Sequence, residues 1–360
     1  MTLAPNDITL GILGGGQLGR MSAMAASRLG IRAVIFTEDE NSPASHVAYK
    51  TIVAQYDDEK ALDTFRELVD VITYEFENIP VETIHYLESN GMKVLPDKSL
   101  LDVSQNRIKE KQFLNDIGIS TAKWKKIEKQ EDLWSVGFQD FIIKTTRFGY
   151  DGKGQIASSL GESKACKNLE EFFKTHIDNE LILEEKIDFT EEISVIIARD
   201  QNGNTSIYGP MQNIHKNHIL HKTIFPAKLG ADITKKAHEI SKKIADKINL
   251  IGVLTIEFFV CSDGTVLANE IAPRTHNSGH WTIDACAVSQ FEQHVRTVCG
   301  LPLGSSHAHS DAEMLNLIGD DVKNVTDYMA QKNTCVHLYG KKEAREGRKM
   351  GHVTFLKEKN

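Results

Sequence analysis

The chain has 360 residues, of which 41% are hydrophobic and 26% are charged, and its formal net charge is −8. The acidic balance argues against a general nucleic-acid-binding protein, and no run approaches the roughly 18 apolar residues of a membrane span. No signal-peptide pattern opens the sequence, and five scattered cysteines without a C-x-x-C pair indicate a reducing compartment. We therefore expect a cytoplasmic protein of two or three domains with neither a membrane nor a nucleic-acid partner.

Strands and helices alternate over the first hundred residues. We predict strands at 8–13, 31–36, 71–76 and 92–95, and helices at 17–30, 59–69 and 80–89. This alternation predicts a parallel, doubly wound sheet, which we expect to end near Pro96.

A helix at 106–117 opens a second α/β region. We predict that it continues with strand 141–145, a helix near 166–175 and strand 180–187. The pattern then changes to successive antiparallel strands, expected at 192–200, 205–211 and 218–227. A helix at 232–248, strands at 254–260 and 265–272 and a small last unit at 305–358 complete the prediction.

A glycine cluster at residues 14–19 joins the first predicted strand to the first predicted helix. Its G-x-G-x-x-G pattern suits phosphate contact by backbone N–H groups at a helix N-terminus. Glu38 and Asp39 follow the second strand, where a ribose-binding acid lies in a dinucleotide enzyme. The cluster thus indicates either an NAD site or a tight turn that permits close helix packing.

A second glycine-rich loop covers residues 146–155. It is not a Walker A loop, because Lys153 lacks the following serine or threonine. We expect the loop to fold over a polyphosphate with the Lys153 ammonium; the alternative is a surface hairpin tip.

Two glutamates lie inside predicted strands. Glu257 is embedded in LTIEFFV, and Glu270 lies in LANEIAPR beside Asn269. A carboxylate in a buried strand is costly unless it is paired or bound to a metal, and Mg²⁺ prefers such oxygen ligands. The alternative is that simple alternation turns each glutamate to solvent.

Polar and basic groups crowd the segment after these strands, Pro273 to Trp281. Such a loop suits small anions, although its histidines could equally cap local backbone groups. A basic run at 340–352 near the C-terminus is usually a solvated face, or it grips a substrate phosphate.

Together these segments closely resemble the ATP-grasp family of 5-(carboxyamino)imidazole ribonucleotide synthases of purine biosynthesis. The matching stretches occur in family order at 11–21, 73–80, 149–155, 184–194, 254–260, 269–286 and 347–352.

The resemblance implies an α/β fold, α+β in its ATP-grasp part, with three domains. A dinucleotide-fold-like N-terminal domain would cover 1–103. An ATP-grasp domain would cover 104–300, with a lid at about 121–187, and a small C-terminal domain would cover 301–360. The family also implies a homodimer.

The resemblance further implies the reaction. ATP, bicarbonate and 5-aminoimidazole ribonucleotide would give the N-carboxylated nucleotide, ADP and phosphate through carboxyphosphate, with two Mg²⁺ ions bound. Glu257 and Glu270 would hold the metal. The residues expected to contact ATP are Arg107, Lys144, Gly149, Tyr150, Asp151, Gly152, Lys153, Gly154, Gln155, Glu184, Glu185, Lys186, Ile187, Glu192, His215, Asn269 and Glu270.

The remaining expected roles concern catalysis and the ribonucleotide. Arg274 would orient bicarbonate or carboxyphosphate, with His276, Asn277 and Lys153 as further catalytic groups. The residues expected to bind the ribonucleotide are Gln17, Leu18, Glu75, Arg274, Lys341, Arg348 and Lys349. On this interpretation the first glycine cluster serves the substrate and binds no NAD.

Two positions depart from the family pattern. Phe148 stands where a second glycine is usual, and Thr275 replaces a proline. Three alternatives stay open at this point: a formate-using glycinamide ribonucleotide transformylase, an NAD-dependent oxidoreductase and a non-catalytic nucleotide sensor.

Overall fold

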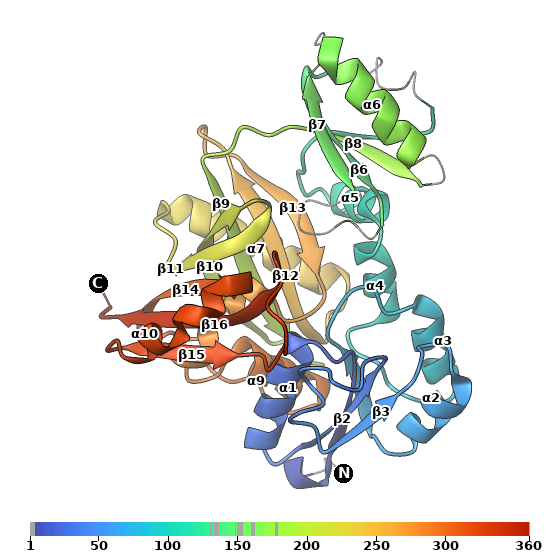
Figure 1. Ribbon diagram of the computed structural model, residues 1–360, viewed down its shortest axis with the longest axis vertical. Helices are drawn as coiled ribbons and strands as arrows, with labels where there is room; N and C mark the ends of the chain where they lie inside the picture. Colours follow the sequence, from blue (N-terminus) through green and yellow to red (C-terminus); the bar gives the residue numbers. More distant parts are fainter. Residues whose placement is uncertain are drawn as a thin grey trace.

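The computed structural model describes residues 4–129, 132, 137–147, 149, 154–159, 163–176 and 179–359, with the backbone alone for 163–167. Figure 1 shows the N-terminal part at the bottom, a small lid at the top right and the C-terminal strands at the left of a large central sheet. Within the described part of the chain, no helix is both long and apolar enough to cross a membrane.

The N-terminal part is a parallel sheet in the order β3-β2-β1-β4. Its elements are β1 (Thr9–Leu13), α1 (Gln17–Arg28), β2 (Arg32–Thr37), β3 (Lys50–Val53), α2 (Glu59–Arg66), β4 (Val71–Tyr74), α3 (Val81–Ser89) and α4 (Lys98–Ser104). The strand β1 is buried throughout, because helices cover both of its faces. The predicted doubly wound sheet is confirmed.

The lid is a four-stranded sheet in the order β5-β8-β6-β7. The helix α5 (Arg107–Asp116) precedes it, and the lid contains β5 (Trp124–Ile127), β6 (Asp140–Thr145), β7 (Gln155–Ser159), α6 (Ser163–Thr175) and β8 (Leu181–Glu185). All its strand pairs are antiparallel. The hairpin of β6 and β7 carries the second glycine-rich loop at its turn.

The central sheet has eight strands in the order β13-β12-β9-β10-β11-β14-β16-β15. Its elements are β9 (Glu191–Arg199), β10 (Thr205–Lys216), β11 (Ile219–Phe225), α7 (Ala231–Lys247), β12 (Gly252–Val260), β13 (Val266–Ala272), α8 (Thr282–Ala285), α9 (Gln290–Val298), β14 (Asp311–Ile318), α10 (Val325–Met329), β15 (Thr334–Leu338) and β16 (Lys349–Lys357). The C-terminal strands therefore extend the central sheet, as Figure 1 shows.

Apolar burial joins these parts. Ile193 and Val195 of β9, Leu254 of β12 and Ile244 of α7 belong to one buried cluster between α7 and the sheet. The helix α9 supplies Val295 to the core of the N-terminal sheet and packs beside α1. The N-terminal part is thereby held against the end of the central sheet that carries the loop after β13.

The element predictions failed mainly at short or edge segments. Before the last unit, whose elements were not predicted singly, the sequence missed β3, β5, β7, α4, α8 and α9, and the strand predicted at 92–95 is a single bridge between Val94 and Ile72. Such segments have few alternating apolar residues, since an edge strand needs only one neighbour.

Candidate active site

The acidic centre of the site lies on the hairpin of β12 and β13. Glu257 and Glu270 are register partners across the two strands. Glu257 is only 8% exposed, so the alternative that it faces solvent is wrong. Burial, followed by the charges of Glu270 and Glu192, holds the pKa of Glu257 well above its usual range. A buried acid opposite a partly exposed one, whose side chain is 39% exposed, forms a set of hard oxygen donors that fits Mg²⁺ and leaves room for a ligand.

A cation at the start of α5 faces this acidic pair. The side chain of Asn106 caps α5 by accepting two backbone N–H groups, which places Arg107 in the first helical turn. Arg107 Nη1 lies 3.6 Å from Glu270 Oε2, and Nη2 donates to the carbonyl of Gly149. Arg107 therefore links the metal-type carboxylate to the glycine-rich loop of the lid.

A second cation comes from the lid strand β6. Lys144 Nζ donates to Glu184 Oε2 of β8 at 2.9 Å. Burial would raise the pKa of Glu184, but the positive charges of Lys111, Lys144 and Arg107 lower it to about 2. The lid thus offers an ionised, paired carboxylate and a buried ammonium on the side that faces β13.

The predicted ATP contacts at 184–187 lie at the end of β8 and lead into β9, so this hinge segment joins the lid to the central sheet. On β9 and β10, Glu192 Oε2 lies 3.0 Å from His215 Nδ1. Glu192 also contributes to the raised pKa of Glu257. These two predicted ATP contacts are therefore close to the acidic centre.

Part of the predicted nucleotide loop is described. Gly154 has φ +68°, and a Cβ at this position would meet Thr145 Oγ1 at 2.6 Å, so glycine is required here. Gln155 begins β7 and is the register partner of Lys144. The predicted contacts Tyr150, Asp151, Gly152 and Lys153, and the departure at Phe148, lie outside the described residues.

Arg274 lies between the metal-type acids and the N-terminal part. Its guanidinium pairs with Glu77 and donates to the carbonyl of Thr275, while its Nε is buried without a hydrogen-bond partner. The charges of Glu270 and Glu75 both act on Arg274. An anion at this point would meet a fixed guanidinium held from behind by Glu77.

The loop after Arg274 is organised by buried polar contacts. The backbone N–H of His276 donates to Gln290, and its ring Nε2 lies 3.6 Å from Glu257 Oε1. Burial and the charges of Arg274 and Lys349 hold the pKa of His276 well below its usual range, which leaves the ring neutral. Both amide atoms of Asn277 are buried without a partner, as expected where a ligand completes the hydrogen bonds.

The first glycine cluster is filled by a side chain of the protein itself. Glu75 accepts the backbone N–H groups of Gly16 and Gly19, the latter at 2.7 Å, at the N-terminus of α1. A dinucleotide pyrophosphate would need these same donors. The NAD interpretation is therefore not supported, and the glycines serve the close approach of Glu75.

The predicted C-terminal cations gather on the same side. The charge of Lys341 acts on Glu75, and the charges of Arg348 and Lys349 act on Lys341. Lys341 Nζ donates to the carbonyl of Lys349 at 2.8 Å. Gln17 and Leu18 stand in the first turn of α1, beside Glu75's hydrogen bonds. The structure thus brings the predicted ribonucleotide residues together.

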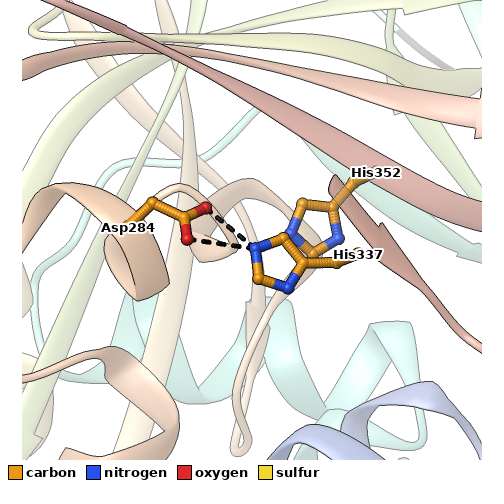
Figure 2. Close-up of side chains that lie close together, drawn as sticks. All are labelled: Asp284, His337 and His352. Atoms are coloured by element: carbon orange, nitrogen blue, oxygen red, sulfur yellow. Dashed lines mark hydrogen bonds and ion pairs between the residues drawn. The ribbon is translucent and has the colours of Figure 1, made fainter. Parts of the chain in front are cut away.

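A buried histidine cluster supports this face. Figure 2 shows His337 directed at Asp284, with Nε2 2.9 Å from one carboxylate oxygen, and His352 beside it. The rings of His337 and His352 stack 4.5 Å apart and only 13° from parallel, so their in-plane lone pairs do not converge on one ion. Tyr339 Oη lies 2.9 Å from His352 Nδ1 and 3.2 Å from His280 Nδ1, which ties β16 to the loop after β13.

Three charged residues of the site were missed from sequence. Glu77 pairs with Arg274, while Glu110 and Lys111 lie buried in α5 beneath β13. Glu77 falls in the quoted stretch 73–80, which was a usable signal. Nothing in the sequence distinguished Glu110 and Lys111 from ordinary solvated helix charges.

Comparisons with known proteins agree with this geometry. A model of the ribonucleotide synthetase preATP-grasp domain matches residues 8–105, the ATP-grasp domain matches 112–291, and the phosphoribosylaminoimidazole carboxylase C-terminal domain matches 312–360. Fold and site define an ATP-grasp ligase.

Individual relatives narrow the class. The N5-carboxyaminoimidazole ribonucleotide synthase of Brucella melitensis is 49% identical over 97% of this chain and 96% of the relative. The Staphylococcus aureus N5-carboxyaminoimidazole synthetase complexed with ADP superposes with a TM-score of 0.91 at 36% identity, over 98% and 94% of the two chains. The Aspergillus clavatus enzyme in complex with ADP and 5-aminoimidazole ribonucleotide gives 0.89 at 28% identity, over 98% and 94%. The chain belongs to the family of N5-carboxyaminoimidazole ribonucleotide synthases.

The filled glycine turn predicts that Gly16→Ala destabilises the protein. A Cβ at Gly16 would lie 2.5 Å from Glu75 Oε1 and must displace a buried carboxylate. We expect the free energy of unfolding in urea to fall by about 1–3 kcal/mol, as for other overpacked sites. Gly230→Ala is the control, because nothing lies within 4 Å of its added Cβ. Equal losses in both variants would contradict this account of the turn.

Proposed function

We propose that the site between the lid, the β12–β13 hairpin and the N-terminal sheet carries out the reaction of this family. The chain is an ATP-dependent ligase of purine biosynthesis that carboxylates 5-aminoimidazole ribonucleotide with bicarbonate. The products are N5-carboxyaminoimidazole ribonucleotide, ADP and phosphate. The single observation that carries the assignment of the site is the register pair of Glu257 and Glu270, with Arg107 3.6 Å from Glu270 and the charge of Arg274 acting on both acids.

The acidic pair is the proposed Mg²⁺ site. Glu257 and Glu270 would hold the metal, with Asn269 beside them, and the oxygen donors suit one or two ions. When bound, Mg²⁺ neutralises the phosphate charge that develops during phosphoryl transfer. Without metal, the positive charges of Arg107 and Arg274 partly compensate the negative charge of Glu270.

ATP is assigned to the region between the lid and the central sheet. Arg107 and Lys144 would contact its phosphates, and the glycine-rich loop would cover them. The hinge 184–187 would contact the base, while Glu192 and His215 would contact the ribose. A loop that closes over the phosphates also excludes water, which protects a reactive carboxyphosphate.

Arg274 is the proposed holder of bicarbonate and carboxyphosphate. Its fixed guanidinium stands between the metal-type acids and Glu75, where the γ-phosphoryl group and the acceptor amine must meet. His276 and Asn277 line the same position with a neutral ring and an unpartnered amide. An oxygen of bicarbonate attacks the γ-phosphorus, and ADP leaves. The amine nitrogen then bonds to the carboxyl carbon, either by displacing phosphate directly or after carboxyphosphate has released CO₂ and phosphate, and the amine gives up one proton on either route.

The ribonucleotide is assigned to the face between α1 and the C-terminal strands. Gln17, Leu18 and Glu75 would contact it at the first glycine turn. Lys341, Arg348 and Lys349 would hold its phosphate, since cations pair with phosphate oxygens.

We also infer the wider organisation of the enzyme. Domain bounds of 1–103, 104–300 and 301–360 are proposed, with the lid at about 121–187; support comes from the separate lid sheet, which runs from β5 to β8. A cytoplasmic location is supported by the free thiols of Cys261, Cys286, Cys299 and Cys335. The homodimer rests on family resemblance, and sedimentation would test it.

The first test is phosphate release from Mg-ATP and bicarbonate, with and without 5-aminoimidazole ribonucleotide. We expect strong stimulation by the ribonucleotide in the wild type. Glu270→Gln should reduce the stimulated rate by about 100-fold or more, because a charge needed in the transition state is lost.

The matched control is Glu239→Gln on α7, because the Glu239 side chain is 65% exposed and lies outside the proposed site. It should release phosphate at the wild-type rate. Absence of stimulation in the wild type would overturn the substrate assignment, and glycinamide ribonucleotide with formate would then be tried. Full activity in Glu270→Gln would overturn the metal assignment.

The C-terminal cations predict a pH dependence. Burial, followed by the charge of Arg348, lowers the pKa of Lys341 to about 8. Below pH 8 the ammonium is present to hold the substrate phosphate, and above pH 8 it is lost. We expect kcat/KM for the ribonucleotide to fall about tenfold per pH unit well above 8. Lys341→Arg should abolish this inflection, because arginine stays charged; an unchanged inflection in that variant would contradict the assigned role.

A further inference from the structure

Two consecutive charged residues of α5 are buried. Glu110 is 2% exposed and Lys111 is 1% exposed, while their neighbour Lys109 pairs with Asp102 at the surface. Removing charges from water is costly unless strong contacts compensate, and apolar residues of similar size often replace buried ion pairs without loss of stability. Packing alone therefore does not explain why charged residues occupy positions 110 and 111.

Both side chains contact the backbone of β13 on either side of Glu270. Lys111 Nζ donates to the carbonyl oxygen of Asn269 at 2.6 Å. Glu110 Oε1 accepts the backbone N–H of Ile271 at 2.6 Å. The two residues thus bracket the carboxylate that we assign to the metal.

The bracket lies at an irregularity of the strand. Glu257 pairs with Glu270, but the next residue of β12, Phe258, pairs with Ala268, so Asn269 is the extra residue of a β-bulge. A bulge leaves its extra residue outside the ladder and redirects neighbouring side chains. Lys111 donates to the carbonyl of that bulged residue. This hydrogen bond fixes the backbone of the bulge and, with it, the direction of the Glu270 side chain.

The same lysine also reaches the lid. Lys111 Nζ lies 3.8 Å from Glu184 Oε2, the oxygen that accepts from Lys144 at 2.9 Å. Arg107, on the same helix, lies 3.6 Å from Glu270. One rigid helix therefore connects the backbone of the metal strand with the ion pair that holds the phosphate-binding lysine.

We propose that Glu110 and Lys111 are positioning residues. They hold the bulge at Asn269, and with it Glu270, in a fixed position relative to Lys144. Their contacts are with the backbone of β13 and with Glu184, and they act through these groups. The inference rests on the proposed function of Glu270, and it adds two residues that set the geometry of the metal and phosphate groups.

The test compares Lys111→Met with Lys109→Met, which removes the same charge from the solvent side of the same helix. Binding of Mn²⁺ in the presence of ADP is followed by the electron paramagnetic resonance signal of the free ion. We expect Lys111→Met to weaken Mn²⁺ binding about 10–100-fold, as for other groups that orient metal ligands, and Lys109→Met to leave it unchanged. Lys111→Arg should recover most of the affinity, because a guanidinium can also donate to Asn269 and Glu184.

Steady-state kinetics provide the second measurement. Lys111→Met should lower kcat and raise KM for Mg-ATP while KM for the ribonucleotide stays unchanged. Glu110→Gln keeps an acceptor for the backbone N–H of Ile271, so its kcat should fall less than that of Glu110→Leu. This pair of variants replaces the Lys111 pair if Lys111→Met does not fold. If Lys111 had only a structural role, Lys111→Arg and Lys111→Met would lose the same fraction of kcat.

Two results would overturn the inference. One is Mn²⁺ affinity in Lys111→Met equal to that in Lys109→Met. The other is an equal rise of KM for both substrates together with a lower unfolding temperature. Glu257→Gln distinguishes failure of the metal site from failure of the positioning role. If neither Glu257→Gln nor Lys111→Met changes Mn²⁺ binding, the proposed metal site is wrong. If Glu257→Gln weakens Mn²⁺ binding and Lys111→Met does not, only the positioning role is rejected.

Discussion

The structure is organised around the repulsion between two carboxylates, Glu257 and Glu270, that the β12–β13 ladder places opposite each other. Burial raises the pKa of Glu257 well above its usual range, and Glu270 raises it further. Such a pair is unfavourable by itself, so a fold that keeps it must surround it with positive charge. Arg107 and Arg274 provide that charge from two directions.

Each part of the protein contributes to this neutralisation. The lid presents Lys144 on Glu184, and α5 presents Arg107 and Lys111 between the lid and β13. The N-terminal sheet supplies Glu77, which holds Arg274 from behind. The segment between β15 and β16 adds Lys341 near Glu75, at the far end of the same row of alternating charges. The nucleotide, the one-carbon unit and the ribonucleotide are assigned along this row.

The fold and the main site could be predicted where chemistry and pattern coincide in short stretches. Glu257 inside LTIEFFV and Glu270 before Pro273 were recognisable because a charge in an apolar strand is rare. The pattern of the first glycine cluster alone left its role open, since it suits pyrophosphate equally well, and only the family resemblance favoured a substrate role. The structure adds the placement of Glu75 against the backbone N–H groups of Gly16 and Gly19.

Other features depend on contacts between distant segments. The burial of Lys111 comes from α5 packing against β13, 158 residues away along the chain. A helix with several charges predicts solvent exposure, and its periodicity cannot reveal an acceptor supplied by a β-bulge elsewhere. The continuous eight-stranded sheet was equally hidden, because β14 joins β11 across the segment that contains β12 and β13.

The most direct test of this account is the thermal unfolding of Glu257→Gln, with and without Mg-ADP. Without metal, the account predicts that the variant unfolds at a higher temperature than the wild type, because glutamine removes the cost of burying the Glu257 carboxyl group, whose pKa is raised by burial and then by the charge of Glu270. With Mg-ADP, the wild type should be stabilised and the variant should gain much less. A variant that is less stable without metal, or that gains as much from Mg-ADP as the wild type, would contradict the claim that these two acids form the metal site.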